Sequence, residues 1–148
     1  MSDLPRHVVC PSCGAVNRIS SSQPTLQAKC GKCHLPLFQG KPVVADEAAF
    51  ERHITRNDIP VLVDFWASWC QPCLAMAPAY ERAAAELEPD FRLLKVNADE
   101  AQQVVAKFAI RSIPTLMLFV RGRPIAQTSG ALDTRRITEW AKRSAMRS

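Results

Sequence analysis

The distribution of apolar residues divides the chain near residue 40. Residues 43–148 contain apolar runs and amphipathic stretches, whereas residues 1–40 include a polar stretch at 20–24 and offer little that could form an apolar core. The Gly-Lys-Pro tripeptide at 40–42 is typical of a hinge. We therefore expect a small domain over residues 1–40 and a larger domain over residues 43–148.

Strands and helices are expected to alternate in the second block. Short apolar runs predict strands, and apolar residues three or four apart predict helices. Asp46 should cap the first helix, and Pro78 should kink the second. The order predicts an α/β fold in which a mixed central sheet has helices on both faces. We expect strands at 43–44, 61–66, 91–96, 115–120 and 125–128, and helices at 47–56, 70–87, 101–108 and from about 133 onward.

Cys70 and Cys73 stand two residues apart, where the predicted strand 61–66 passes into the predicted helix 70–87. A Cys-x-x-Cys at such a junction indicates a redox dithiol rather than a structural disulfide. The free N–H groups at a helix N-terminus favour a thiolate on Cys70, which we expect to be exposed. Cys73 lies one turn further on and should be shielded, in position to resolve a mixed disulfide. The motif predicts thiol–disulfide exchange.

Two charged residues interrupt apolar strands. Asp64 lies inside 61–66 and Lys95 inside 91–96. An unpaired buried carboxylate is costly, so pairing of Asp64 with Lys95 on a neighbouring strand would explain both residues. Burial would raise the pKa of Asp64 and make it a proton acceptor for Cys73. The alternative is that each residue faces solvent at a strand edge.

The other four cysteines lie in the first block as two Cys-x-x-Cys knuckles. Sixteen residues separate the knuckles, a spacing typical of a structural zinc site with four sulfur ligands, Cys10, Cys13, Cys30 and Cys33. A block of about 40 residues is too small to fold on apolar burial alone, so metal binding would supply folding free energy. Two disulfides or a second redox pair are the alternatives.

Residues around the knuckles carry further expectations. Gly14 and Gly31 suit the positive φ that such turns often require. His34 could substitute as a ligand, but four cysteines already complete the site. We therefore expect His34, like His7 and His53, at the surface.

Composition limits the classes of function. The net charge is +5 without a long basic run, so charge alone does not indicate nucleic-acid binding. The first residues lack the apolar core of a secretory signal, and no apolar run approaches the length of a membrane span. We expect a soluble cytoplasmic protein that binds neither nucleic acid nor membrane.

Taken together, these motifs resemble the thioredoxin family in order and spacing. The resemblance rests on residues 63–73, Pro78, Lys95, the Ile-Pro-Thr at 113–115 and the Gly-Ala-Leu at 130–132. It covers roughly residues 43–148 and implies a thioredoxin fold. With the four-cysteine block in front, the whole chain resembles the bacterial thioredoxin 2 type, which carries an N-terminal zinc ribbon.

The resemblance also implies roles for individual residues. Cys70 would attack a protein disulfide and Cys73 would resolve the intermediate, with Asp64 assisting proton transfer beside Lys95. Pro114 would be cis and would bring the Ile113 backbone to the substrate. The substrate-binding groove would include Trp69, Gln71, Pro72, Ile113, Pro114 and Gly130.

Partners and cofactors follow from the same resemblance. The implied function is a protein-disulfide reductase whose partners are disulfide-containing client proteins. An NADPH-dependent thioredoxin reductase would reduce the oxidised dithiol again, in an electron-transport chain. We expect a monomer that holds a structural Zn2+ and no organic cofactor.

Two residues depart from the family pattern. Gln71 stands where the family usually has Gly, and Leu74 where it commonly has a basic residue. Loss of a cation at position 74 should weaken thiolate stabilisation, so the sequence does not determine the reduction potential of the dithiol. A disulfide oxidant or isomerase is therefore an alternative. A further alternative is a zinc-dependent module for docking or redox sensing.

Overall fold

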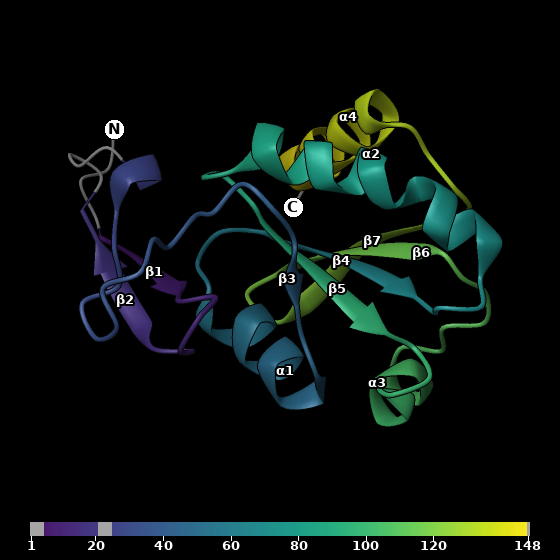
Figure 1. Cartoon of the computed structure of the whole chain (residues 1–148), viewed down its shortest axis with the longest axis horizontal. Helices are drawn as coiled ribbons and strands as arrows, with labels where there is room; N and C mark the ends of the chain where they lie inside the picture. Colours follow the sequence, from purple (N-terminus) through teal and green to yellow (C-terminus); the bar gives the residue numbers. More distant parts are fainter. Residues whose placement is uncertain (1–4, 21–24, 148) are drawn as a thin grey trace.

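The computed structural model describes residues 5–20 and 25–147, so most of the polar stretch 20–24 lies outside it. Its larger sheet has the strand order β3-β5-β4-β6-β7 (Figure 1). The strands are β3 (Val43–Val44), β4 (Val61–Trp66), β5 (Arg92–Asn97), β6 (Thr115–Val120) and β7 (Arg123–Ser129). The helices are α1 (Glu47–Arg56), α2 (Gln71–Leu87), α3 (Gln102–Lys107) and α4 (Thr134–Met146). The predicted β-α-β-α-β-α-β-β-α order is confirmed.

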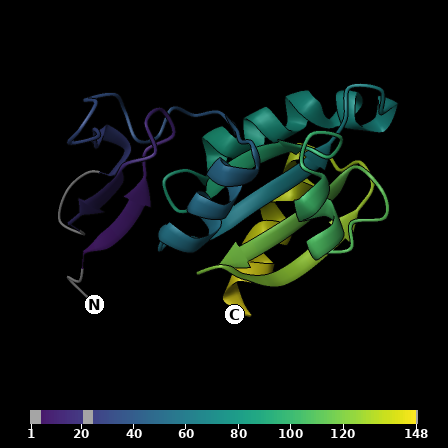
Figure 2. The same ribbon diagram turned by 90° about the horizontal axis from the view of Figure 1, so that it is seen from below.

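The sheet is mixed, as expected. Strands β3, β5 and β4 are parallel, while β6 runs antiparallel to β4, and β7 runs antiparallel to β6. Helices α2 and α4 cover one face, and α1 and α3 cover the other (Figures 1 and 2). Central strand β4 is apolar on both sides because both faces are covered: Val63 faces α1 and α3, and Leu62 faces α2 and α4.

The hairpin differs slightly from the prediction. Strand β7 begins at Arg123, two residues before the predicted start, because the turn consists of Arg121 and Gly122 alone. Both residues have positive φ, 50° and 83°, which is the geometry of the two-residue turn that suits strand twist. Pro124 follows next to a bulge on this edge strand, where a missing N–H is tolerated.

The first block forms a hairpin with its own small core. Strands β1 (Arg6–Val9) and β2 (Val16–Ile19) pair antiparallel, and a short 3-10 turn follows at Thr25–Gln27 (η1). Figure 2 shows this hairpin to one side of the layered sheet and helices. The prediction that the block offers little for an apolar core is wrong. Its buried cluster includes Val8, Ile19, Leu37, Phe38 and, from the second block, Ile59.

Arg92 joins the two blocks. Its side chain is fully buried, and its guanidinium donates hydrogen bonds to the carbonyl oxygens of Val9 (3.1 Å) and Leu37 (2.8 Å). The same guanidinium pairs with Glu88 at 3.3 Å, and Glu88 accepts a hydrogen bond from the Gly40 amide at 2.7 Å. The tripeptide predicted as a hinge is therefore tied to the larger sheet at its first residue.

The last turn of α1 forms a second contact with the first block. Asn57 accepts a hydrogen bond from the Val9 amide at 2.8 Å, and its amide nitrogen lies 3.0 Å from His53 Nδ1. The expectation that His53 lies at the surface is wrong, because only 3% of it is exposed. Burial, with smaller contributions from Arg92 and Arg52, lowers the pKa of His53 to about 3. His53 is therefore a neutral member of this junction at pH 7.

Candidate active site and metal centre

Cys70 and Cys73 form a disulfide at the start of α2, with Cα atoms 5.3 Å apart. Cys70 is the N-cap, and its Sγ accepts a hydrogen bond from the Cys73 amide at 3.2 Å. The helix N-terminus thus directs a backbone donor at the first sulfur, which favours a thiolate there after reduction. The expected exposure of Cys70 is wrong, since 5% of it is exposed against 3% of Cys73. Trp66 and Ile113 pack against the pair and cover it.

The loop before β6 lies against the dithiol. The Ile113–Pro114 peptide bond is cis, and the Ile113 carbonyl oxygen lies 3.7 Å from Cys70 Sγ. Gly130, with φ of 97°, donates its amide hydrogen to the Pro114 carbonyl at 2.9 Å. The Ile113 amide has no hydrogen-bond partner within residues 5–20 and 25–147. A donor and an acceptor of the backbone are therefore both available beside the reactive sulfur.

Asp64 lies in the middle of β4 on the face covered by α2, between Lys95 of β5 and Leu116 of β6 in the strand register. Only 1% of it is exposed, so the strand-edge alternative is wrong for this residue. Burial raises the pKa of Asp64 to about 7, and the positive charge of Lys95 offsets part of that effect. Its Oδ1 atom has no hydrogen-bond partner in the described part of the chain. The carboxyl can therefore exchange a proton near neutral pH.

Lys95 is aligned with Asp64 but does not form a direct ion pair with it. No ion pair between them is found among the described residues, and the Lys95 ammonium lies 4.5 Å from the centroid of the Trp66 ring. The ring face attracts the cation and holds it on the same face of the sheet as Asp64. Lys95 thus acts on Asp64 through its charge, from a neighbouring position.

Tyr80 is a residue whose polar role the sequence did not reveal. Sequence reasoning placed it only within the predicted helix 70–87. The buried hydroxyl lies within hydrogen-bond distance of the carbonyl oxygens of Leu62 (3.1 Å) and Leu94 (2.7 Å). Burial, followed by the nearby Asp64, raises the pKa of Tyr80 well above its usual value. Tyr80 therefore remains protonated and positions α2 on the two strands that hold Asp64 and Lys95.

Exposed apolar side chains flank the dithiol. Trp69 is 66% exposed and Leu74 is 43% exposed, values that are unusual for large hydrophobic residues in this chain. The Trp69 indole N–H donates to Asp99 Oδ2 at 2.8 Å, a contact for which no sequence signal exists. Gln71 and Gly130 are also exposed around the same end of α2. These residues form an accessible rim around two buried sulfurs.

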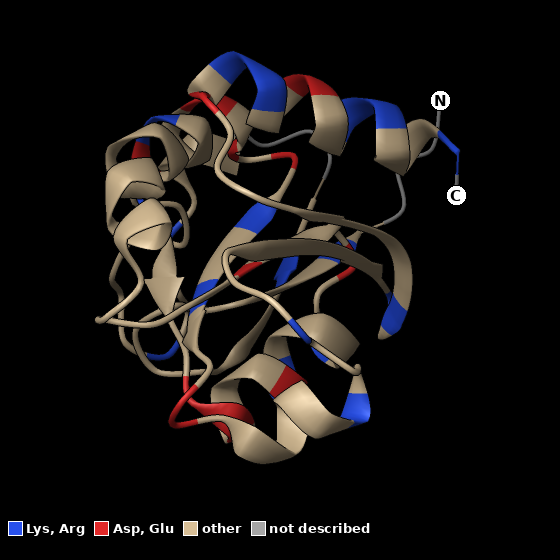
Figure 3. Cartoon of the chain, turned by 90° about the vertical axis from the view of Figure 1, so that its right-hand side faces the viewer, with Lys and Arg blue, Asp and Glu red and all other residues tan. Residues whose placement is uncertain are grey.

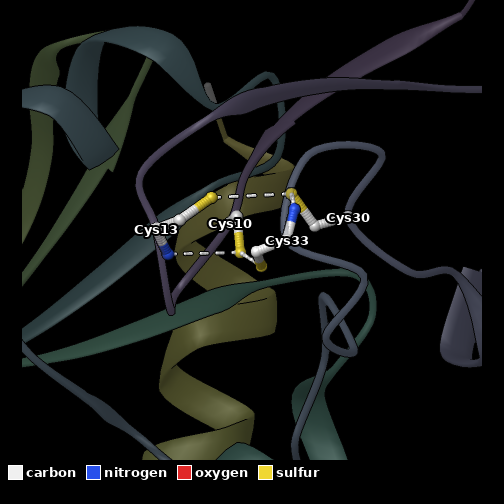
Figure 4. A group of neighbouring side chains, drawn as sticks. All are labelled: Cys10, Cys13, Cys30 and Cys33. Carbon is white, nitrogen blue, oxygen red and sulfur yellow. Dashed lines mark hydrogen bonds between the residues drawn. The ribbon is translucent and has the colours of Figure 1, made fainter.

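The remaining four cysteines form one compact cluster (Figure 4). None of the four forms a disulfide, so the two-disulfide alternative is wrong. The Sγ atoms lie within 4.8 Å of one another, and two pairs, Cys10 with Cys33 and Cys13 with Cys30, are 3.6 Å apart. Tetrahedral zinc with Zn–S bonds of about 2.3 Å places its sulfurs about 3.8 Å apart. The cluster fits a four-thiolate zinc site.

Backbone amides support the sulfurs of the first cysteine in each knuckle. Cys10 Sγ accepts hydrogen bonds from Ser12 (3.3 Å) and Cys13 (3.5 Å), and Cys30 Sγ accepts them from Lys32 (3.4 Å) and Cys33 (3.5 Å). The side-chain amide of Asn17, which sequence reasoning missed, adds a bond to Cys30 Sγ at 3.4 Å. Such donors stabilise thiolates that bind a metal.

The turns of the two knuckles correct one expectation. Gly14 has the predicted positive φ of 80°, but Gly31 does not. His34, directly after the second knuckle, takes the equivalent position with φ of 67°, and its amide bonds to the Cys30 carbonyl at 2.9 Å. The positive φ belongs to the residue after each second cysteine. His34 is exposed, as expected, and is not part of the cysteine cluster.

Charge and hydropathy add two observations. Lys and Arg lie on several separate elements, with Asp and Glu between them, rather than on one continuous face in the view of Figure 3. Among residues 5–20 and 25–147, no helix has the length and apolar character needed to cross a membrane.

Two family models match separate parts of the chain. Residues 41–143 match the model described as Thioredoxin. Residues 9–34, which include all four clustered cysteines, match the model described as Thioredoxin 2, N-terminal.

Known proteins agree with these matches. Thioredoxin C-3 of Corynebacterium nephridii is 38% identical over 133 residues, which are 90% of this chain and 91% of that protein. A thioredoxin of Rhodospirillum rubrum is 42% identical over 66% of this chain and 94% of its own length. Among solved structures, a mutant thioredoxin from Halobacterium salinarum superimposes with a TM-score of 0.64 at 27% identity, covering 71% of this chain and 91% of that one.

Proposed function

The chain belongs to the thioredoxin family, and from this premise we propose how its residues reduce a protein disulfide. The protein is a thiol–disulfide oxidoreductase of the protein-disulfide reductase type. The proposed roles divide the chain into a zinc ribbon over residues 1–40 and a catalytic thioredoxin domain over residues 43–148. One observation carries the proposal: the Cys70–Cys73 pair lies at the N-terminus of α2 beside the cis Ile113–Pro114 bond.

The first step is attack by the reduced protein. The Cys70 thiolate attacks one sulfur of the client disulfide, forms a mixed disulfide and releases the other client sulfur as a thiolate. The donor from the Cys73 amide and the α2 dipole stabilise the attacking thiolate. Because Cys70 is almost covered, the client must bring its disulfide up to the sulfur beside Ile113 and Trp66, which pack against the pair.

The second step resolves the mixed disulfide. The Cys73 thiol gives its proton to the Asp64 carboxylate, and the resulting thiolate attacks Cys70 Sγ. The Cys70–Cys73 disulfide forms, and the second client sulfur leaves as a thiolate. Two electrons have passed from the dithiol to the client. A pKa near 7 suits Asp64 to this role, because it can accept and later return a proton at neutral pH.

Client docking uses the backbone and the apolar rim. An extended client segment would pair with the Ile113 amide, which has no partner within the described ranges. Trp69 supplies exposed apolar area, and the cis Pro114 and Gly130 form the facing wall. Gln71 and Pro72, which open α2, lie next to the reactive sulfur and complete the proposed contact surface.

The zinc ribbon would hold one Zn2+ through Cys10, Cys13, Cys30 and Cys33. The sulfur separations fit tetrahedral zinc, and four thiolates leave no open position for catalysis. When bound, the ion would supply structural cross-linking only. The four residues would hold β1 and the segment after η1 together, and through Arg92 they would hold both against the catalytic domain.

Regeneration requires a source of electrons. An NADPH-dependent thioredoxin reductase would reduce the oxidised dithiol, and the protein would thereby take part in electron transport. We propose that it acts as a monomer. The cytoplasm is the proposed location, because thiols there are kept reduced.

Insulin reduction tests this function. With NADPH and a bacterial thioredoxin reductase, the wild-type protein should precipitate the insulin B chain and consume NADPH. Cys70→Ser should lose all turnover, while Ser68→Ala, which changes an exposed residue beside the motif, should keep it. No turnover by the wild type, or undiminished turnover by Cys70→Ser, would refute the proposal.

A further inference from the structure

A cavity of about 390 Å3 lies where the ribbon meets the edge of the larger sheet. It is separate from the dithiol, which contributes no residue to it. The walls come from five parts of the chain: the ribbon, the linker into β3, strand β3, helix α2 and strand β5. The polar and ribbon residues that line it are Pro11, Gln39, Lys41, Glu81, Arg92 and Lys95.

The cavity has an excess of positive charge. Three of its lining residues are basic and one, Glu81, is acidic. Glu88, which does not line the cavity, neutralises Arg92. Lys41 and Lys95 have no ion-pair partner within the described ranges, so the lining contains two unpaired basic residues and one acidic residue. A negatively charged ligand would therefore be attracted to this cavity.

Arg92 lines the cavity, but its guanidinium is fully engaged or buried. It is fully buried, and its two terminal nitrogens already bond to Glu88, Val9 and Leu37. Its Nε–H has no partner in the described part of the chain. The Nε atom is itself buried, so Arg92 forms part of the wall and offers no donor to a ligand inside the cavity.

We propose that this cavity binds a small oxyanion of the phosphate or carboxylate class, held by Lys41 and Lys95. Glu81 would accept a hydrogen bond from a hydroxyl group of the same ligand, as a protonated phosphate oxygen provides. The site exists only while the ribbon is docked, because Pro11 and Gln39 close one side of it.

The ligand would influence the catalytic domain through Lys95. The Lys95 ammonium lies over Trp66 and is aligned with Asp64, whose other titratable neighbour is Tyr80 on α2. An anion paired with Lys95 would weaken the attraction between that cation and the Asp64 carboxylate. The pKa of Asp64 would rise further, and proton transfer from Cys73 would require a higher pH.

Calorimetry with inorganic phosphate tests the site directly. Oxidised protein, titrated at constant ionic strength with chloride as the balancing ion, should show saturable binding of one phosphate per chain. Lys41→Gln should weaken binding by about fivefold or more, because it removes one of two cations. Lys142→Gln, which changes an exposed lysine of α4 outside the cavity, should leave binding unchanged. Absence of saturable binding, or equal weakening by both variants, would overturn the proposal.

A carboxyl NMR titration of Asp64 tests the link to Lys95. Phosphate at the wild-type dissociation constant should move the titration midpoint of Asp64 upward in the wild type and should move it less in Lys41→Gln. An unchanged midpoint in the wild type at this phosphate concentration would overturn the link. Both measurements use the oxidised protein without a client, so they are independent of whether the dithiol reduces insulin.

Discussion

Arg92, the first residue of β5, donates a hydrogen bond to the carbonyl oxygen of Leu37 at 2.8 Å. Leu37 belongs to the buried cluster of the ribbon, so this bond joins the small domain to an inner strand of the larger sheet. The Arg92 side chain also lies 4.8 Å from the ring of Phe38. The buried guanidinium thus helps to hold the ribbon on the catalytic domain, beside the contact between Asn57 and Val9.

Replacing Arg92 should destabilise the protein. Arg92→Met leaves the Glu88 carboxylate buried without its partner, and removal of one member of a buried ion pair costs about 3–5 kcal/mol. Urea unfolding at pH 7 measures this loss. The double variant Arg92→Met, Glu88→Gln should recover part of the stability, because it removes the unpaired charge but keeps an acceptor for the Gly40 amide. No recovery in the double variant would show that the unpaired carboxylate is not the cause.

Asp64 should make stability depend on pH. Its pKa is about 7 in the folded protein, against an ordinary value of 3.8, so the folded state retains a proton that the unfolded chain loses between these values. The free energy of unfolding therefore falls as pH rises from about 4 to about 7. Asp64→Asn lacks this loss. Its advantage over the wild type in free energy of unfolding should therefore be larger at pH 8 than at pH 4, by on the order of 4 kcal/mol.

Urea unfolding of both proteins across this pH range measures the difference. Asp90→Asn, which changes an exposed carboxyl group at the end of the α2–β5 loop, is the control and should show no such divergence. If the free energies of unfolding of the wild type and Asp64→Asn changed in parallel with pH, the raised pKa of the buried Asp64 would be contradicted.

Asp64→Asn should also slow resolution of the mixed disulfide. The carboxylate accepts the Cys73 proton only when ionised, so the wild-type rate should rise as pH passes through about 7. The variant should lack this rise with pH and should resolve the mixed disulfide at least about tenfold more slowly at pH 8. Rapid-mixing experiments that follow release of the second client thiol would measure this rate. Equal rates for both proteins at pH 8 would remove Asp64 from the mechanism.

The ribbon should contain one zinc ion per chain. Elemental analysis of the purified reduced protein should give that ratio, and Cys30→Ala should lose the metal, because its sulfur is one of the four clustered ligands. His34→Asn is the matched control. Asparagine tolerates the positive φ at this position, and His34 lies outside the cluster, so zinc content should be unchanged. Stoichiometric zinc in Cys30→Ala would argue for a different ligand set.

Restoring a cation at position 74 should change the reduction potential. Leu74 is 43% exposed beside Cys70, and a lysine there would stabilise the thiolate of the reduced form. An exposed charge interaction of about 0.5 kcal/mol corresponds to a potential about 10 mV more positive. Equilibration with a glutathione redox buffer measures the reduction potential. Leu74→Gln should not shift the potential, and the effect of Leu74→Lys should fade in high salt. A shift that salt does not reduce would have another origin.

The elements of the larger domain were predictable because their patterns are strong and local. Strand β4 is a continuous apolar run, and α2 repeats its buried residues at helical spacing, so both were located to within one residue. Asp64 was also apparent from sequence, because a carboxylate within an apolar strand is exceptional.

The junction of the domains could not be predicted, because its partners are distant in sequence. Val8 and Leu37 are buried in one cluster with Ile59 of the second block, which is why the ribbon core was missed. His53 is hydrophilic and was assigned to the surface, but the docked ribbon covers it. Arg92 begins a strand like any other residue, and no local pattern marks its buried role.

Trapping of a client on Cys73→Ser tests the central claim most directly. This variant keeps the attacking thiol but lacks the resolving one, so a disulfide-containing client should remain covalently attached. Mass spectrometry of the purified adduct should locate the bond at Cys70, and reductant should release the client. Attachment at a cysteine of the zinc cluster, or no adduct with clients that the wild type reduces, would contradict the division of roles between Cys70 and Cys73.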